Sequence, residues 1–253
     1  MNFASLVPYD LHPWQWAAWI CMGLCIGLSK TGFSGITASI TPVMALIFGA
    51  RESTGIVLPL YCFADILGVS YYHSHAEWKY IVKLLPWALA GFGAALLADQ
   101  LVPVQEFKYL LGGCILAGTF VMIWNDFRAK DRPPPSTWWF SALFGIAGGF
   151  STMIGNAAGP IMSVFLLSMR LPKNSFVGTT AWFFLIINYL KLPIQFFVWK
   201  NITSETLLFD LTLVPAVIAG AVMGIFLIKK ISDPIYRKII FVLTLISTIL
   251  LFI

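Results

Sequence analysis

The sequence predicts an all-α polytopic membrane protein with two inverted-topology repeats, each a broken or re-entrant helix pair followed by three transmembrane helices. First, 59% of the 253 residues are hydrophobic and 11% are charged, against roughly 25% charged in a soluble domain. Second, the apolar runs are continuous, whereas the strands of a β-barrel alternate apolar and polar residues. Third, one order of elements occurs twice. This composition excludes a disordered chain, a soluble enzyme and a nucleic-acid-binding domain.

Six segments are long enough, or nearly so, to cross about 30 Å of hydrocarbon as helices rising 1.5 Å per residue. We expect each to be one membrane span. The predicted spans are residues 54–74, 81–98, 105–125, 176–199, 206–228 and 235–253.

Two further apolar regions, 14–48 and 138–169, are interrupted by small and polar residues at 27–35 and 148–156. Each flank has about 13–15 residues, which is short for a membrane span. The flanks can therefore form a re-entrant hairpin or two short crossing helices. Irregular backbone at this depth is tolerated only where it is buried in protein or lines a cavity.

The two halves resemble each other in the order of their elements and in isolated residues. We interpret 1–125 and 138–253 as two repeats of one membrane domain, joined by a charged, proline-rich linker at 126–137. In this alignment Pro42 corresponds to Pro160, Gly55 to Gly178, Asp65 to Asn188, Pro86 to Pro215 and Gly91 to Gly220.

The distribution of basic residues favours an inverted arrangement. If each broken region returns to its starting side, three crossings follow it, and the second half is inverted relative to the first. Eleven basic residues then share one side, which the positive-inside rule makes cytoplasmic. They are Lys79, Lys83, Arg128, Lys130, Arg132, Arg170, Lys173, Lys229, Lys230, Arg237 and Lys238. The other side receives Arg51, Lys108 and Lys200, so both termini are expected outside, in a multi-pass protein of the cell (inner or plasma) membrane.

Four polar residues fall deep within apolar segments: Lys30, Asp65, Asn188 and Lys191. An ionisable residue at mid-membrane costs about 2.5–3.5 kcal/mol on insertion scales and is retained when it is paired or binds something. Asp65 is the only carboxylate that we expect at this depth. Either it pairs with a lysine as an internal brace, or the lysines bind an anion and Asp65 accepts a proton.

Both interruptions are rich in glycine and hydrogen-bond donors, and helices restarting near Ile36 and Ala157 would point their N-termini at mid-membrane. Free N–H groups and the helix dipole make such termini anion sites. The alternative is that the small residues only permit close helix packing. The candidate ligands here are Ser29, Lys30, Thr31, Gly32, Ser34, Gly35, Thr37, Thr152, Gly155, Asn156 and Gly159.

Three motifs resemble the TauE/SafE sulfite exporter family. They are Gly27-Leu-Ser-Lys-Thr-Gly-Phe-Ser-Gly35 leading to Pro42, Gly149-Phe-Ser-Thr-Met-Ile-Gly-Asn-Ala-Ala-Gly-Pro160, and Asn188-Tyr-Leu-Lys-Leu-Pro193. The resemblance implies a proton-coupled secondary transporter of sulfite or of organosulfonates such as sulfoacetate. The first motif departs from the family in having fewer glycines and in carrying Lys30, which leaves open a different substrate.

We therefore expect a small anion to bind the candidate ligands together with Asn188 and Lys191, and Asp65 to couple transport to protons. The alternative is a passive channel or uniporter in which Asp65 is structural. His73-x-His75-x-Glu77 could ligate a metal but lies where interfacial side chains are ordinary. Without a GxSxG or HExxH motif, no enzyme is expected. We expect no cofactor, no metal and no nucleic-acid partner, only the substrate and the lipid bilayer; the sequence does not indicate the oligomeric state.

Overall fold

The computed structural model describes residue 9 and residues 11–98 and 137–252, and it is helical throughout apart from short connections. The predicted span at 105–125 and nearly all of the linker at 126–137 lie outside the described residues. In chain order the elements are α1 (Pro13–Thr31), η2 (Ser34–Ile36), α2 (Thr37–Phe48), α3 (Ala50–Tyr72), η3 (His73–His75), α4 (Trp78–Ala98), α6 (Trp138–Gly155), α7 (Gly159–Ser168), α8 (Lys173–Pro193), η4 (Ile194–Val198), α9 (Ser204–Leu211), α10 (Val214–Lys230) and α11 (Asp233–Phe252).

Three of these helical segments are long and apolar enough to cross a membrane: Arg51–His75, Trp78–Ala98 and Lys173–Val198. They confirm the spans predicted at 54–74, 81–98 and 176–199. A 20-residue helix, α11, covers nearly all of the span predicted at 235–253.

The span predicted at 206–228 is not one continuous helix, because this segment forms two helices, α9 and α10, bent by 53°. Together they are apolar and long enough for one span. The bend follows from Pro215 in the first turn of α10. Its nitrogen has no hydrogen to donate to the carbonyl of Leu211, and its ring clashes with that carbonyl in a continuous helix.

The two interruptions exist, but they are shorter than predicted. α1 continues to Thr31 and α6 continues to Gly155, so the breaks are confined to the few residues before η2 and α7. The helical flanks are accordingly unequal, at 19 and 12 residues in the first region and 18 and 10 in the second. The expectation that Lys30 lies in a loop is wrong: it lies in the last turn of α1.

Glycines inside α1 and α6 allow neighbouring helices to approach rather than ending the helix. A Cβ at Gly27 would lie 2.0 Å from the carbonyl oxygen of Val217 in α10. A Cβ at Gly149 would lie 1.9 Å from the carbonyl oxygen of Ala88 in α4. Since ordinary Cβ contacts are 3.4–4 Å, only glycine permits this contact. The alternative reading of these glycines, close helix packing, therefore describes these two positions.

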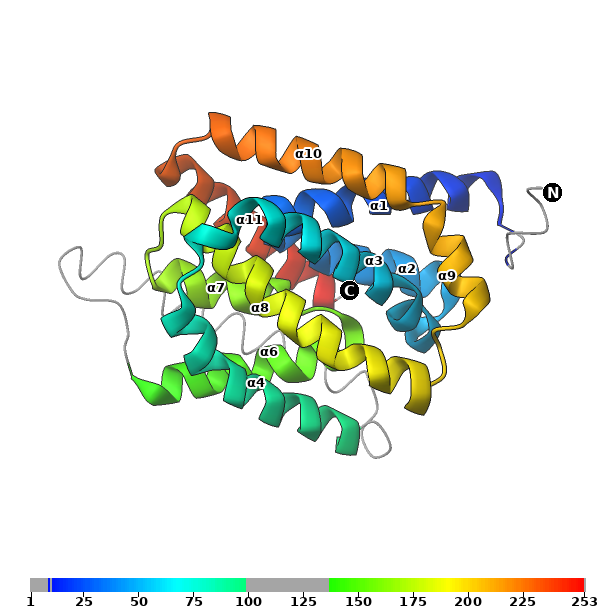
Figure 1. Ribbon diagram of the computed structural model, residues 1–253, viewed down its shortest axis with the longest axis horizontal. Helices are drawn as coiled ribbons and strands as arrows, with labels where there is room; N and C mark the ends of the chain where they lie inside the picture. Colours follow the sequence, from blue (N-terminus) through cyan, green and yellow to red (C-terminus); the bar gives the residue numbers. More distant parts are fainter. Residues whose placement is uncertain (1–8, 10, 99–136, 253) are drawn as a thin grey trace.

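Most helices run along the long axis of the molecule, so the connections gather at two ends (Figure 1). We define the Arg51 end by residues 48–55 and 199–201, which meet where Gly55 abuts Asn201. We define the His75 end by residues 72–76, 173 and 228–231, where Gly178 abuts Tyr72 and the Lys173 ammonium donates to the Ile228 carbonyl.

Each broken pair returns to the end of the bundle at which it begins. Phe48, at the end of α2, contacts Trp19, in the first half of α1, with ring centroids 5.4 Å apart. Phe165, near the end of α7, stacks on Phe140, at the start of α6, at 5.7 Å. The two turning points meet inside the molecule, because the Thr41 hydroxyl of α2 donates to the Gly155 carbonyl of α6 at 2.7 Å.

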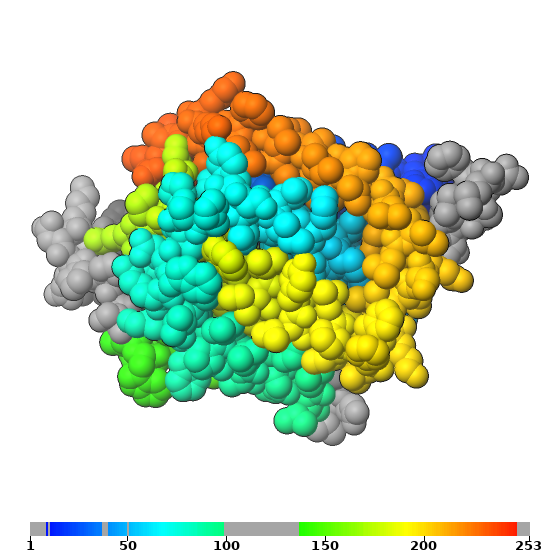
Figure 2. Space-filling model, in the orientation of Figure 1, coloured from blue at the N-terminus to red at the C-terminus, as the bar shows by residue number. Residues whose placement is uncertain are grey.

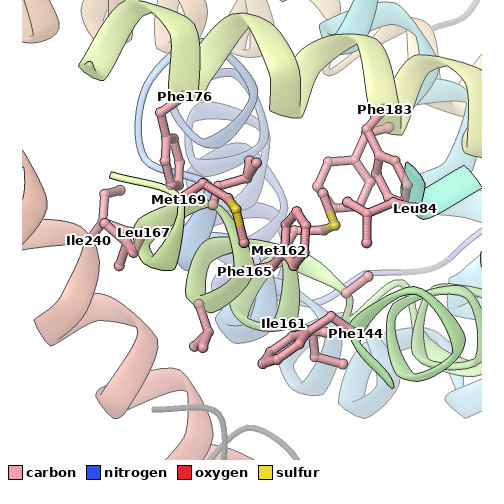
Figure 3. Packing of buried hydrophobic residues seen from close by; sticks show 14 of the residues in the cluster. Leu84, Phe144, Ile161, Met162, Phe165, Leu167, Met169, Phe176, Phe183 and Ile240 are labelled. Atoms are coloured by element: carbon pink, nitrogen blue, oxygen red, sulfur yellow. The ribbon is translucent and has the colours of Figure 1, made fainter. Parts of the chain in front are cut away.

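The largest apolar core surrounds α7, all ten residues of which are buried. In Figure 3, Met162 of α7 lies close to Phe183 of α8, and Met169, which follows α7, lies close to Phe176 of α8. Phe165 of α7 contacts Phe144 of α6, with ring centroids 6.0 Å apart. The outer faces of α4, α8, α9 and α10, all of which are visible in Figure 2, expose large apolar side chains, as expected for contact with lipid.

Candidate functional site

Two antiparallel helices, α3 and α8, cross the centre of the molecule and carry three of the four deep polar residues. Asp65 lies in α3, and Asn188 and Lys191 lie in α8. The antiparallel pairing is fixed by small residues, since a Cβ at Gly68 of α3 would lie 3.3 Å from Ala181 of α8. The same Cβ would lie 2.8 Å from the Lys30 carbonyl oxygen, which brings the end of α1 to the crossing.

Lys30, Asp65 and Asn188 form one buried cluster. The Lys30 ammonium lies 2.9 Å from one carboxylate oxygen of Asp65. The side-chain amide of Asn188 donates to the other oxygen at 2.6 Å. The ammonium also lies over the rings of Tyr61 and Phe184, 4.8 Å and 4.3 Å from their centroids. Cation–π attraction and a carboxylate together compensate the lost hydration of the lysine.

Lys191 forms a second cluster with the end of α6. Its ammonium donates to the Thr152 carbonyl at 2.7 Å and to the side-chain oxygen of Asn156. The Thr152 hydroxyl lies 3.4 Å from the same nitrogen. Asn156 in turn donates to the Thr54 carbonyl of α3 at 3.2 Å. Asn156 has φ +54° and ends α6 in the left-handed conformation that asparagine tolerates.

A small cavity separates the two clusters. Its free volume is about 10 Å³, which is about the space of one water molecule. Five predicted ligands line it, together with two aromatic rings. The lining residues are Lys30, Tyr61, Thr152, Asn156, Gly159, Phe184 and Asn188. The side chains of the two clusters are all buried, so this arrangement is closed and must open to admit an oxyanion.

Four other predicted ligands lie in contacts between helices. The Thr31 hydroxyl donates to the Gly27 and Ala221 carbonyls, at 3.0 and 2.8 Å. The Gly32 carbonyl accepts from the Tyr236 hydroxyl of α11. The remaining two are in η2: the Ser34 and Ser163 hydroxyls share a hydrogen bond of 2.9 Å, and Gly35 packs against Leu243, also in α11.

Three predicted ligands remain. Ser29 is buried in the last turn of α1, and its hydroxyl has no hydrogen-bond partner among the described residues. Gly155 lines a second cavity with Asn156. The side chain of Thr37 lies outside what the structure describes.

Sequence reasoning missed several residues of this region. Tyr61 and Phe184 line the cavity but look like ordinary lipid-facing aromatics in an apolar run. Sequence reasoning also did not single out Asp210 of α9, a second buried carboxylate that is only 4% exposed. Neither carboxylate oxygen of Asp210 has a hydrogen-bond partner in the described part of the chain.

The chemistry of the site suits an anion. The two lysines supply positive charge, while Thr152, Asn156 and Asn188 offer further hydrogen-bond donors, and Gly159 starts α7 at the cavity wall. An oxyanion needs this combination of cations and donors. The described residues contain no group of three or more His, Cys, Asp or Glu side chains able to hold a metal ion.

Apolar helices of membrane-spanning length, broken helix pairs and a buried polar site between them define a multi-pass membrane protein with the features of a transporter. The chain belongs to the sulfite exporter TauE/SafE family, whose family model matches residues 19–251. It is therefore a membrane transport protein of an anion-exporting family. Comparison with curated proteins and with solved structures gave no match.

Proposed function

We propose that the protein transports small sulfur-containing oxyanions, such as sulfite or organosulfonates, and binds them between Lys30 and Lys191. The observation that carries this proposal is one closed cavity bordered by two clusters, each with a buried lysine. An oxyanion there would accept hydrogen bonds from the ammonium groups and from the Asn156 and Asn188 amides, in exchange for their present partners.

Charge balance supports coupling to protons. With both lysines and Asp65 ionised, the site carries one net positive charge, which a monoanion neutralises. A dianion such as sulfite would leave one net negative charge in a low-dielectric interior, which is costly. A proton on Asp65 would restore neutrality, because the Lys30 ammonium could then turn to the anion. We propose that Asp65 carries the coupled proton.

We further propose that the two halves are inverted repeats. The predicted equivalents Asp65 and Asn188 hydrogen-bond to each other across the antiparallel pair α3 and α8. Two more predicted equivalents make matching contacts: a Cβ at Gly91 of α4 would lie 2.1 Å from a carbonyl oxygen of α6, and one at Gly220 of α10 would lie 2.1 Å from a carbonyl oxygen of α1. Rocking of one repeat on the other would then alternate access to the cavity.

The basic residues support an orientation with the His75 end in the cytoplasm and both termini outside. Eight described lysines and arginines lie in a connection or in the first or last two turns of a helix at this end, against two, Arg51 and Lys200, at the Arg51 end. The eight are Lys79, Lys83, Arg170, Lys173, Lys229, Lys230, Arg237 and Lys238. Positive loops remain on the cytoplasmic side of a cell membrane.

The contacts of Asp65 also favour a second candidate, a uniporter or channel without proton coupling. Its carboxylate is held by Lys30 at 2.9 Å and by Asn188 at 2.6 Å. This is the arrangement expected of an internal brace. In that case the lysines still attract the anion, but the anion follows only its own gradient.

Flux into proteoliposomes distinguishes the two candidates. Purified protein is supplied with labelled sulfite or labelled sulfoacetate, with and without an imposed pH gradient. We expect saturable flux that the pH gradient drives above equilibrium, and loss of this drive in Asp65→Asn. Flux in the wild-type protein that never exceeds equilibrium would favour the uniporter or channel. Absence of flux with both anions would refute the proposed substrates.

A further inference from the structure

A second small cavity adjoins the first and extends toward the Arg51 end. The two cavities share Tyr61 and Asn156, which therefore form the partition between them. The second cavity is also lined by Ser53 and Thr54 in the first turns of α3 and by Thr41 of α2. Its free volume is again about 10 Å³, room for about one water molecule.

A chain of polar side chains runs beside the second cavity to the Arg51 end. Asn156, a partner of Lys191, donates to the Thr54 carbonyl at 3.2 Å. The Thr54 hydroxyl lies 3.4 Å from the amide nitrogens of both Gln195 and Asn201. Asn201 also donates to the Arg51 carbonyl at 3.1 Å, in an exposed position. Polar contacts thus continue from the site to the end of the bundle.

This chain contains more polar atoms than its own contacts use. The side-chain oxygens of Gln195 and Asn201 and the Tyr61 hydroxyl are buried without a hydrogen-bond partner in the described ranges. Gln195 is fully buried and lies in the π-helical turn η4. Buried polar atoms are rarely left unpaired, and π-helical turns are frequent at functional sites. Both features indicate that something polar passes here.

The opposite direction is closed by backbone packing. Toward the His75 end, α3 and α8 approach so closely that a Cβ at Gly178 would lie 2.7 Å from the Tyr72 carbonyl oxygen. A Cβ at Gly68 would lie 2.8 Å from the Lys30 carbonyl oxygen. At the Arg51 end a Cβ at Gly55 would also lie 2.6 Å from the Asn201 carbonyl oxygen. In this direction, however, the second cavity lies between that contact and the site, and Tyr61 and Asn156 stand between the two cavities.

We propose that the anion moves between the site and the membrane face at the Arg51 end through a passage formed by Thr54, Gln195 and Asn201, gated by Tyr61 and Asn156. Arg51, whose guanidinium lies 5.1 Å from the centroid of the Trp199 ring, stands at the mouth and raises the local anion concentration. The inference deepens the proposed function and rests on it for the identity of the cargo.

Cysteine accessibility tests the passage without requiring transport. The four native cysteines are replaced by alanine or serine, and Thr54→Cys or Gln195→Cys is introduced. Membrane vesicles of both orientations then receive a membrane-impermeant anionic thiosulfonate. Arg51→Cys and Lys230→Cys mark the two faces. The matched control is Thr180→Cys, because Thr180 is buried in α8, bonds only within its own helix and lines neither cavity.

We expect both passage cysteines to react at least tenfold faster than Thr180→Cys, and only from the face at which Arg51→Cys reacts. Sulfoacetate should slow the reaction. Reaction no faster than the Thr180→Cys control, or reaction from the Lys230→Cys face, would overturn the passage. If the passage cysteines react from one face only, but sulfoacetate does not protect them and the protein moves no sulfur anion, the passage is retained and the proposed cargo is refuted.

A conservative substitution separates passage from binding. Thr54→Val keeps the shape of the side chain and removes the hydroxyl that contacts Gln195 and Asn201. We expect flux to fall at least fivefold while the equilibrium dissociation constant of the anion changes less than twofold. The control Thr180→Val should change neither, and equal flux in the two variants would count against the passage.

Discussion

Removing one partner of the Lys30–Asp65 pair should destabilise the protein far more than removing both. The two charges lie 2.9 Å apart and both side chains are at most 4% exposed. At an effective dielectric of about 20, unit charges at this distance attract by about 6 kcal/mol, much of it offset by desolvation. Asp65→Asn leaves the Lys30 ammonium buried without its counter-ion, and breaking such a pair costs about 3–5 kcal/mol.

The double variant Lys30→Met, Asp65→Asn has no unpaired charge, and its side-chain amide can still accept from Asn188. We expect its free energy of unfolding to lie within about 1 kcal/mol of wild type. The control is Asp210→Asn, which removes a buried carboxylate that has no hydrogen-bond partner among the described residues and should cost little. Denaturant unfolding in mixed micelles, followed by tryptophan fluorescence, measures all four proteins. Equal losses in the single and double variants would refute the pairing.

Two further predictions concern helix packing. Gly91→Ala places a Cβ 2.1 Å from the Ile146 carbonyl oxygen, so α4 and α6 must separate by more than 1 Å. This strain costs about 1–3 kcal/mol and should lower the melting temperature by several degrees. The control Gly93→Ala, whose Cβ would have nothing within 4 Å, should leave the melting temperature unchanged or raise it. Lys173→Met removes two hydrogen bonds from the ammonium to the end of α10 and should lower the melting temperature while leaving anion affinity unchanged. Equal melting of the two glycine variants, or weakened anion binding in Lys173→Met, would contradict these accounts.

The sequence was sufficient to predict the broken pairs, three of the long spans and the four deep polar residues that gather near the cavity. Asp65, Asn188 and Lys191 could be found because charged or amide side chains stand out in apolar runs. It was not sufficient to distinguish a glycine that turns the chain from one that permits packing. Gly27 and Gly149 fall within the predicted interruptions but lie in helices, and their packing partners in α10 and α4 are remote in sequence.

The rotation of each helix about its axis was equally beyond sequence reasoning. Thr31 and Lys30 are adjacent, yet the Thr31 hydroxyl bonds to α10 and the Lys30 ammonium lines the cavity. Which of them faces the site depends on where α10 packs. Tyr61 and Phe184 carry no polar signal that separates a cavity wall from a lipid-facing ring. Only the contact with the Lys30 ammonium distinguishes them.

Direct binding tests the central claim, that a sulfur oxyanion binds between the two buried lysines. Equilibrium dialysis of purified protein with labelled sulfite or sulfoacetate should give saturable binding at one site per chain. Affinity should fall at least 100-fold in Lys191→Met and stay within twofold in Lys238→Met, which removes an exposed lysine that does not line the cavity. Unchanged affinity in a correctly folded Lys191→Met protein would contradict the claim.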